Sequence, residues 1–241
     1  MSIRAETRSE KYLGFPVYVG RSRTDVFAYL KERVWQRIQG WKEKLLSKTG
    51  KEIMIKAVAQ AIPVFAMGCF DLTKKICGQI SAMIAKYWWN NKDKENSIHW
   101  VSWERLTQPK EEGGLGFRDL HSFNMAMIAK QGWRFIQTPE SLCARILKAK
   151  YFRNTSVLQA KVKDGCSYTW RSIMQGVEVL KGVIWRVGNG AGIHIWGDPW
   201  LPRDITRRPI TPKGRTLLQR VEELIDPTTE NWDEQLLNQT F

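Results

Sequence analysis

Apolar side chains recur at three- and four-residue intervals through the first third of the chain, which is the spacing of one helical face. A first helix is predicted to begin behind Thr24 or Asp25, either of which can cap it, with a face formed by Val26, Leu30, Val34, Ile38, Trp41 and Leu45. A second is predicted over residues 51–70, kinked or ended by Pro63, and a third over residues 72–89. Three amphipathic helices joined by short turns predict a compact bundle.

The rest of the chain alternates helical periodicity with turn-forming residues. Three further helices and a short one are predicted, at residues 119–137, 141–151, 168–181 and 217–226. Two apolar runs, residues 183–187 and 193–196, flank a segment rich in Asn and Gly, which predicts a small β-hairpin. Residues beyond Thr228 are predicted to be frayed. The predicted fold class is therefore mainly α, with a basic helical bundle followed by further helices and a small β-hairpin region.

The net charge of the chain adds a class of binding partner to the predicted fold. The chain has 38 Lys+Arg against 24 Asp+Glu, a formal net charge of +14. An excess of this size favours a polyanionic partner, nucleic acid above all, over a merely solvated basic surface. On the first predicted helix only Glu32 and Glu43 offer opposite charge, so salt bridges between successive turns do not account for the lysines and arginines.

Membrane insertion is disfavoured by the same pattern. No stretch approaches the ~20 apolar residues needed to span a bilayer, and residues 1–10 lack the apolar core of a secretion signal. We therefore expect an intracellular, soluble protein that makes no membrane contact.

Catalytic motifs are not found. A polymerase needs paired carboxylates for two metal ions, and the sequence has no Asp-Asp pair. It has no phosphate-binding P-loop, and the glycines at 188, 190 and 192 lie between predicted strands, where a dinucleotide site is not expected. The cysteines lack metal-binding spacing and are expected to be buried reduced thiols: Cys69, Cys77, Cys143 and Cys166. We expect no catalytic residue, no metal and no cofactor.

The sequence contains twelve tryptophans. A tryptophan can stack on a nucleic-acid base or fill a core, and core is the more common role. Trp41 and Trp88 lie on apolar helical faces and are predicted to be core residues.

Short motifs occur in an order that resembles plant LINE-type (non-LTR) retrotransposon reverse transcriptases. The first is the aromatic segment Tyr12, Leu13, Gly14, Phe15 and Pro16. It is followed by WKEKLLS and related motifs over residues 41–63, GGLGFRDL at 113–120, WRVGNG at 185–190 and WGDPWL at 196–201. The matches run over residues 11–232, nearly the whole chain.

In that family, this stretch lies downstream of the catalytic palm. The resemblance, taken with the pattern, divides the chain into a primer-grip-like remnant, a thumb-like helical bundle, a helical connector, and a helix with the hairpin region and a C-terminal tail, at residues 1–23, 24–92, 93–166 and 167–241. It implies a thumb that lies along template–primer through sequence-independent, salt-sensitive phosphate contacts. The candidate nucleic-acid-binding residues are Arg21, Arg23, Arg37, Lys42, Lys44, Lys48, Lys51 and Lys56. Lys51 stands where the family more often has arginine.

Several functions stay open at this point. The chain is expected to be a non-catalytic fragment that binds RNA, DNA or a hybrid of the two. The alternatives are a domesticated structural subunit of a ribonucleoprotein or other multiprotein complex, an unselected decayed reading frame, and reverse transcription in trans with a separate palm. A retroelement origin implies the nucleus, and a domesticated copy could work in an organelle.

Overall fold

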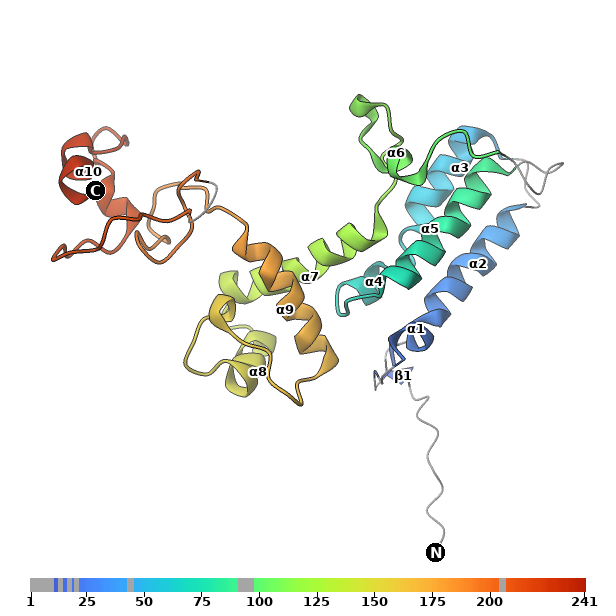
Figure 1. The fold of residues 1–241 in the computed structure, drawn as a ribbon, viewed down its shortest axis with the longest axis horizontal. Helices are drawn as coiled ribbons and strands as arrows, with labels where there is room; N and C mark the ends of the chain where they lie inside the picture. The colour runs from blue at the N-terminus through green and yellow to red at the C-terminus, as the bar shows by residue number, and fades with distance from the viewer. Residues whose placement is uncertain are drawn as a thin grey trace, which may run out of the picture. The chain divides into compact units, whose positions relative to one another are not determined.

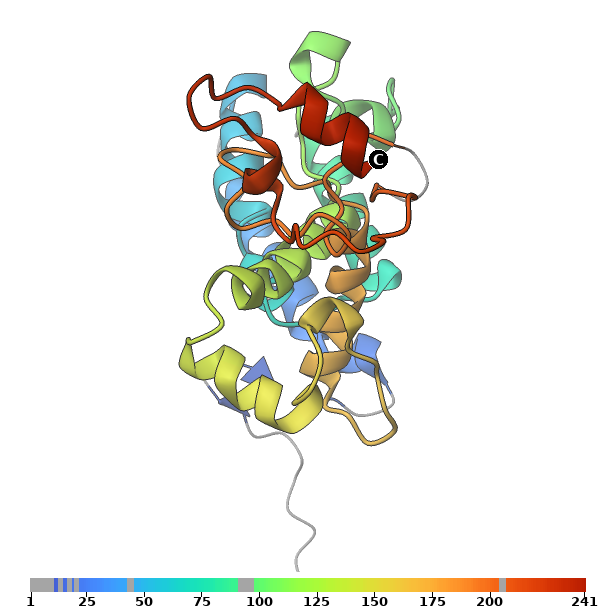
Figure 2. The same ribbon diagram turned by 90° about the vertical axis from the view of Figure 1, so that its left-hand side faces the viewer.

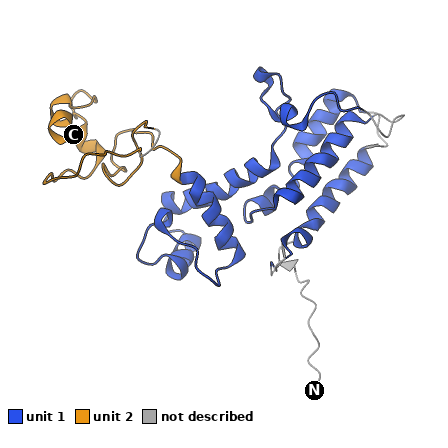
Figure 3. Ribbon diagram, in the orientation of Figure 1, with its two compact units in different colours: residues 1–180 blue, residues 181–241 orange. Residues whose placement is uncertain are grey.

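The computed structural model of the protein describes residues 11–12, 15–16, 19, 22–42, 46–90, 98–203 and 207–241. Within these residues the protein is mainly α-helical, as predicted (Figure 1). It divides into two compact units, residues 1–180 and 181–241, which are described separately (Figure 3). The four-segment division expected from the sequence stays a prediction.

The first part of unit 1 is a helical bundle. Its elements are α1 (Arg23–Val26), α2 (Ala28–Lys42), α3 (Lys48–Met54), the π-helical η1 (Ile55–Ala59), α4 (Val64–Met67) and α5 (Lys74–Trp89). α2 and α5 lie side by side (Figures 1 and 2). The predicted apolar face of α2 is buried at Leu30, Val34, Ile38 and Trp41, and packs in one core with residues of α5 such as Ile76, Ile80 and Ile84. Trp41 and Trp88 are both buried, which confirms their predicted core role.

The helix predicted over residues 51–70 is interrupted. Ser47 caps α3 by accepting a hydrogen bond from Gly50 N at 3.1 Å, and the helix then widens into η1. A turn that includes Pro63 separates η1 from α4, so the predicted break at this proline is confirmed.

Ahead of the bundle, two short strands pair antiparallel: β1 (Lys11–Tyr12) and β2 (Phe15–Pro16), with Tyr12 opposite Phe15. The two strands fall in the segment that the resemblance identifies as primer-grip-like, an assignment that stays a prediction. Leu13 and Gly14, which join the strands, lie outside the described residues.

The second part of unit 1 is built from helices that the sequence predicts closely. Its elements are α6 (Trp103–Thr107), η2 (Lys110–Glu112), α7 (Leu120–Gln137), α8 (Leu142–Tyr151), η3 (Val157–Gln159) and α9 (Tyr168–Lys181). α7, α8 and α9 enclose a second core, with Trp170 fully buried in it. α9 therefore packs within unit 1, although the sequence grouped it with the segment that follows.

A set of buried polar contacts ties the α4–α5 turn to the second part of unit 1. Asn124 of α7 accepts a hydrogen bond from Leu72 N at 2.7 Å and donates to the carbonyls of Met67 and Phe70, both at 2.9 Å. From α9, Ser172 Oγ accepts a hydrogen bond from Asp71 N at 2.9 Å. The two cores of unit 1 are therefore joined by specific hydrogen bonds as well as by packing.

Unit 2 contains the 3-10 helix η4 (Val221–Leu224) and α10 (Glu234–Thr240), with a small core of Ile193, Ile195, Trp200, Val221 and Leu224. The β-hairpin predicted here is wrong. Ile195 N donates to Gln219 O at 3.0 Å and Val221 N donates to Ile193 O at 2.9 Å, so the second predicted strand pairs with the segment before η4.

One of the glycines that suggested a hairpin turn is needed for a close backbone contact instead. Gly190 has φ +76°, and a Cβ built on it would lie 2.4 Å from Glu222 N. Glycine is required because the loop touches the backbone of η4, and sequence patterns cannot distinguish this close approach from a type I′ turn.

Residues 234–240 form the helix α10, although the sequence predicts fraying beyond Thr228. Asp233 caps α10 by accepting a hydrogen bond from Leu236 N at 2.9 Å. Leu236 and Leu237 pack against the core of unit 2, which stabilises this short helix.

Candidate nucleic-acid interface

The positive charge of the protein belongs to unit 1. Of the 38 Lys+Arg, eight lie in residues 181–241, together with eight of the 24 Asp+Glu. Unit 2 is therefore formally neutral, and residues 1–180 carry 30 basic against 16 acidic residues, the full net charge of +14. A polyanion would be attracted to unit 1 far more than to unit 2.

Two of the predicted phosphate-binding lysines meet at the C-terminal end of α5. Lys48 Nζ donates to Trp88 O at 2.8 Å, and Lys51 Nζ donates to Asn90 O at 2.6 Å. Carbonyls at the end of a helix lie beyond the hydrogen-bond pattern of the helix itself, and cations are favoured at this end of the helix dipole. The lysines therefore stabilise the bundle, and an ammonium group has three N–H donors, so each also keeps donors for a phosphate.

Aromatic rings surround the same two ammonium groups. Lys48 Nζ lies 4.8 Å from the centroid of the Trp88 ring and 5.4 Å from that of Trp89. Lys51 Nζ lies 5.4 Å from the centroid of Tyr87. Burial lowers the pKa of Lys48, and burial followed by the charge of Lys48 lowers the pKa of Lys51. Two like charges held close together favour an anion between them.

Lys56 lies in a different environment. The carboxylate of Glu52 accepts hydrogen bonds from Lys56 Nζ at 2.8 Å and from Lys110 Nζ at 2.9 Å. Hydrogen bonds from Lys56 and then Lys110 hold the pKa of the Glu52 carboxyl below its ordinary value. Because this carboxylate is shared by the two lysines, Lys56 is less available to a phosphate than the sequence suggests. Sequence reasoning missed Lys110, whose link to Glu52 depends on the fold.

The remaining predicted residues are spread over the bundle. Arg37 is exposed on α2, and the guanidinium of Arg23 lies 4.9 Å from the centroid of the Tyr168 ring. Lys42 is the last residue of α2, and nothing of its side chain is described. Arg21 and Lys44 lie outside the described residues. The structure thus brings Lys48 and Lys51 together and leaves Arg23, Arg37 and Lys56 in other surroundings.

A second set of basic side chains, which the candidate residues did not include, lies on α8 and in the segment after it. Its six side chains are all exposed: Arg145, Lys148, Lys150, Arg153, Lys161 and Lys163. Residues 145–163 contain no aspartate or glutamate, a signal that is readable in the sequence. Arg153 Nε donates to Ala149 O at 2.6 Å, capping the C-terminal end of α8. We call this set the α8 basic surface.

Possible metal ligands and thiols are the other reactive groups of the described part of the chain. No three His, Cys, Asp or Glu side chains within it are grouped so that they could hold a metal ion. Cys77 is buried as expected, and burial is the largest cause that raises the pKa of its thiol, to about 12. Cys143 is exposed, so the expectation of a buried thiol is wrong there, because it lies on the outer face of α8.

Of the helices described, none has the length and apolar character needed to cross a membrane.

Two plant proteins are similar to the chain. An uncharacterized mitochondrial protein of Arabidopsis thaliana is 41% identical over 143 residues, which are 58% of this chain and 93% of that protein. A second protein of the same plant, described as a "Putative ribonuclease H protein", is 36% identical over 192 residues, 77% of this chain. The chain spans 31% of the length of this second relative.

No family model matches the chain, and no solved structure matches it at a significant level. The match to the shorter relative covers nearly all of that protein. The chain therefore belongs to the family of this mitochondrial protein, and the two relatives together place it among retroelement-related proteins.

Proposed function

We propose that the chain is a non-catalytic nucleic-acid-binding protein derived from a LINE-type reverse transcriptase, which holds template–primer through sequence-independent phosphate contacts. The observation that carries this proposal is the location of the full net charge of +14 in unit 1. Phosphate contacts supply most of the affinity of such binding, and they require basic side chains on a rigid scaffold rather than a shaped pocket.

The paired lysines of the bundle fit this role. Lys48 is exposed and Lys51 half-buried, and each is held by one hydrogen bond to the end of α5. Because these contacts reduce the freedom of the side chains before binding, less entropy is lost when a phosphate docks. The thumb-like assignment rests on the motif order and on this bundle.

Binding to a fluorescent RNA–DNA hybrid at rising salt tests the proposal. The logarithm of the association constant should fall linearly with the logarithm of the salt concentration, with a slope of about −0.9 for each phosphate contacted. A flat response would reject phosphate binding. The same samples, given Mg²⁺ and nucleotides, should leave the primer unextended and the RNA strand uncut, and either reaction would reject the non-catalytic assignment.

A second candidate function is a domesticated structural subunit of a ribonucleoprotein or other multiprotein complex. It is favoured by the length of the shorter relative, because 93% of that protein consists of the region that matches this chain. Since that relative is named as mitochondrial, an organelle is a compartment to examine beside the nucleus. Recovery of a defined assembly with the tagged protein from plant extracts would support this function, and a free monomer would oppose it.

A further inference from the structure

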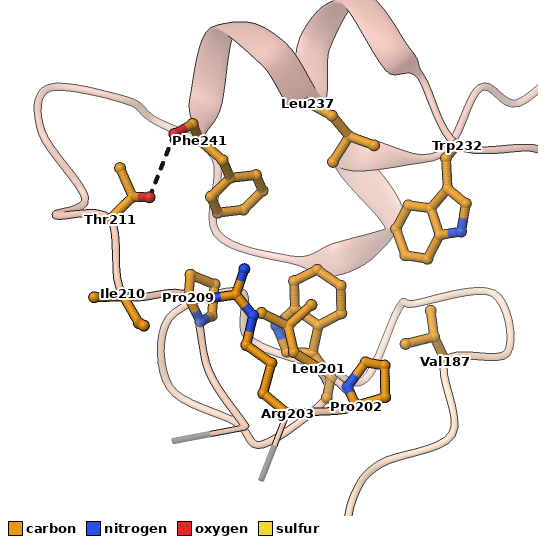
Figure 4. A pocket seen from close by; sticks show the side chains of 11 residues that line it. Val187, Leu201, Pro202, Arg203, Pro209, Ile210, Thr211, Trp232, Leu237 and Phe241 are labelled. Atoms are coloured by element: carbon orange, nitrogen blue, oxygen red, sulfur yellow. Dashed lines mark hydrogen bonds between the residues drawn. The ribbon is translucent and has the colours of Figure 1, made fainter. Parts of the chain in front are cut away.

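Unit 2 contains a pocket whose chemistry differs from that of unit 1. Its volume is about 520 Å³ and its walls are mainly apolar (Figure 4). Leu237 of α10 and Phe241, which follows this helix, contribute one wall, and Leu201, Pro202 and Pro209 contribute another. A hollow of this size and lining takes a bulky apolar group.

Two of the residues that line the pocket are tryptophans, and their rings stack on each other. Trp200 is 7% exposed, and its ring stacks on that of Trp232 with centroids 5.8 Å apart. The indole N–H of Trp200 donates to Ile195 O at 2.7 Å, so its polar atom is already satisfied. What remains for a ligand is ring surface, which favours apolar contact.

One charged side chain lines the pocket. The guanidinium of Arg203 lines it, in the orientation shown in Figure 4. A ligand in the pocket would therefore meet the positive charge of Arg203.

The acidic segment at residues 222–241 disfavours nucleic acid as the occupant of the pocket. Residues 222–241 contain six acidic residues and no lysine or arginine, and they supply Trp232 and the α10 wall. A phosphate backbone that followed this wall would be repelled, and unit 2 as a whole has no net charge to offset the repulsion. A peptide can instead place a single carboxylate beside its apolar side chain, where it can pair with Arg203.

We propose that the pocket is a peptide-binding site, which takes one bulky apolar side chain of a partner protein and pairs a flanking carboxylate with Arg203. The site is separate from the proposed nucleic-acid interface, so the protein would join a polyanion on unit 1 to a protein partner on unit 2.

Selection of a random twelve-residue peptide library on the full chain tests this site. Enriched peptides should share an aromatic or large aliphatic residue beside an acidic one, and the best is then labelled for fluorescence anisotropy. Trp232→Ala and Phe241→Ala should each weaken binding by about tenfold, because side chains of this kind dominate the binding energy of interfaces. Leu217→Glu is the matched control: Leu217 is 90% exposed and does not line the pocket, so binding should be unchanged.

A charge exchange separates the proposed contact from a folding defect. Arg203→Glu should weaken the selected peptide by about three- to tenfold, whereas a peptide whose acidic residue is replaced by lysine should regain affinity for this variant. Arg215→Glu, an exposed change outside the pocket, should have no such effect. The proposal is overturned if no peptide is enriched, if the pocket variants bind normally, or if Trp232→Ala weakens binding of a twenty-residue oligothymidine instead.

Discussion

Asn124 shows how one polar side chain can fix the relation between two helical layers. It is fully buried, and its side-chain amide satisfies one backbone N–H and two backbone carbonyls of the α4–α5 turn. A turn of this kind would otherwise bury unpaired backbone groups, each of which costs free energy when it loses water. The sequence placed Asn124 in a helix, but its partners are more than fifty residues away and could not be predicted from spacing.

Replacing Asn124 by alanine should lower the free energy of unfolding by about 3 kcal/mol, because it leaves three buried backbone groups without their partner. Urea unfolding followed by circular dichroism measures the change. Asn154→Ala is the control, since Asn154 is exposed in the loop after α8, and it should alter stability by less than about 0.5 kcal/mol. An equal effect of the two substitutions would contradict a bridging role for Asn124.

The lysines illustrate what sequence analysis can and cannot predict at this scale. Lys48, Lys51 and Lys56 were predicted together as phosphate-binding residues from charge and resemblance. The structure places two of them on the carbonyls at the end of α5 and the third on Glu52. Residue type predicts that a side chain is cationic, whereas its partners depend on which helix ends the fold brings to it.

At the scale of elements, the crossing of α7 and α9 depends on glycine. A Cβ added to Gly176 would lie 2.4 Å from Ala129 N and 2.6 Å from Ile128 C, both backbone atoms of α7. Backbone atoms cannot move aside as the end of a side chain can, so any larger residue must push the helices apart. This crossing closes the second core of unit 1, in which Trp170 is buried.

Gly176→Ala should therefore destabilise the protein by about 2–3 kcal/mol or more. Gly78→Ala is a matched control within α5, because its added methyl group would meet nothing within 4 Å. There alanine should stabilise the helix by about 0.5–1 kcal/mol, its advantage over glycine in a helix interior. Thermal unfolding of the two variants should give shifts of opposite sign, and a stabilised Gly176→Ala variant would show that the helices can separate without loss.

The three long helices in the second part of unit 1 were predicted well because their signal is local. The period of α7, α8 and α9 is visible in the sequence, and their observed bounds lie within one residue of the prediction at each end. The hairpin was wrong because the apolar run at Ile193–Ile195 takes its partner from residues 219–221, far along the chain. Apolar runs with glycines between them indicate extended segments but do not determine which segments pair.

For the whole molecule, composition predicted the total charge but not its location. The sequence assigned nucleic-acid binding to one basic bundle, whereas the excess extends over unit 1, including the α8 basic surface, and ends where unit 2 begins. This boundary could not be placed from charge alone, because basic residues also occur in unit 2, where an equal number of acidic residues offsets them.

This division predicts that equal charge changes will have unequal effects in the two units. Arg33 and Arg37 are exposed on α2, and their replacement by glutamate should weaken hybrid binding and make the salt slope less negative by about two. Arg186→Glu with Arg215→Glu changes the net charge of the protein by the same amount, at exposed positions of unit 2. If binding depends on unit 1, the unit 2 variant keeps the wild-type slope. Equal loss in both variants would instead mean that the hybrid responds to total charge, and fluorescence anisotropy from about 50 to 300 mM salt distinguishes the two outcomes.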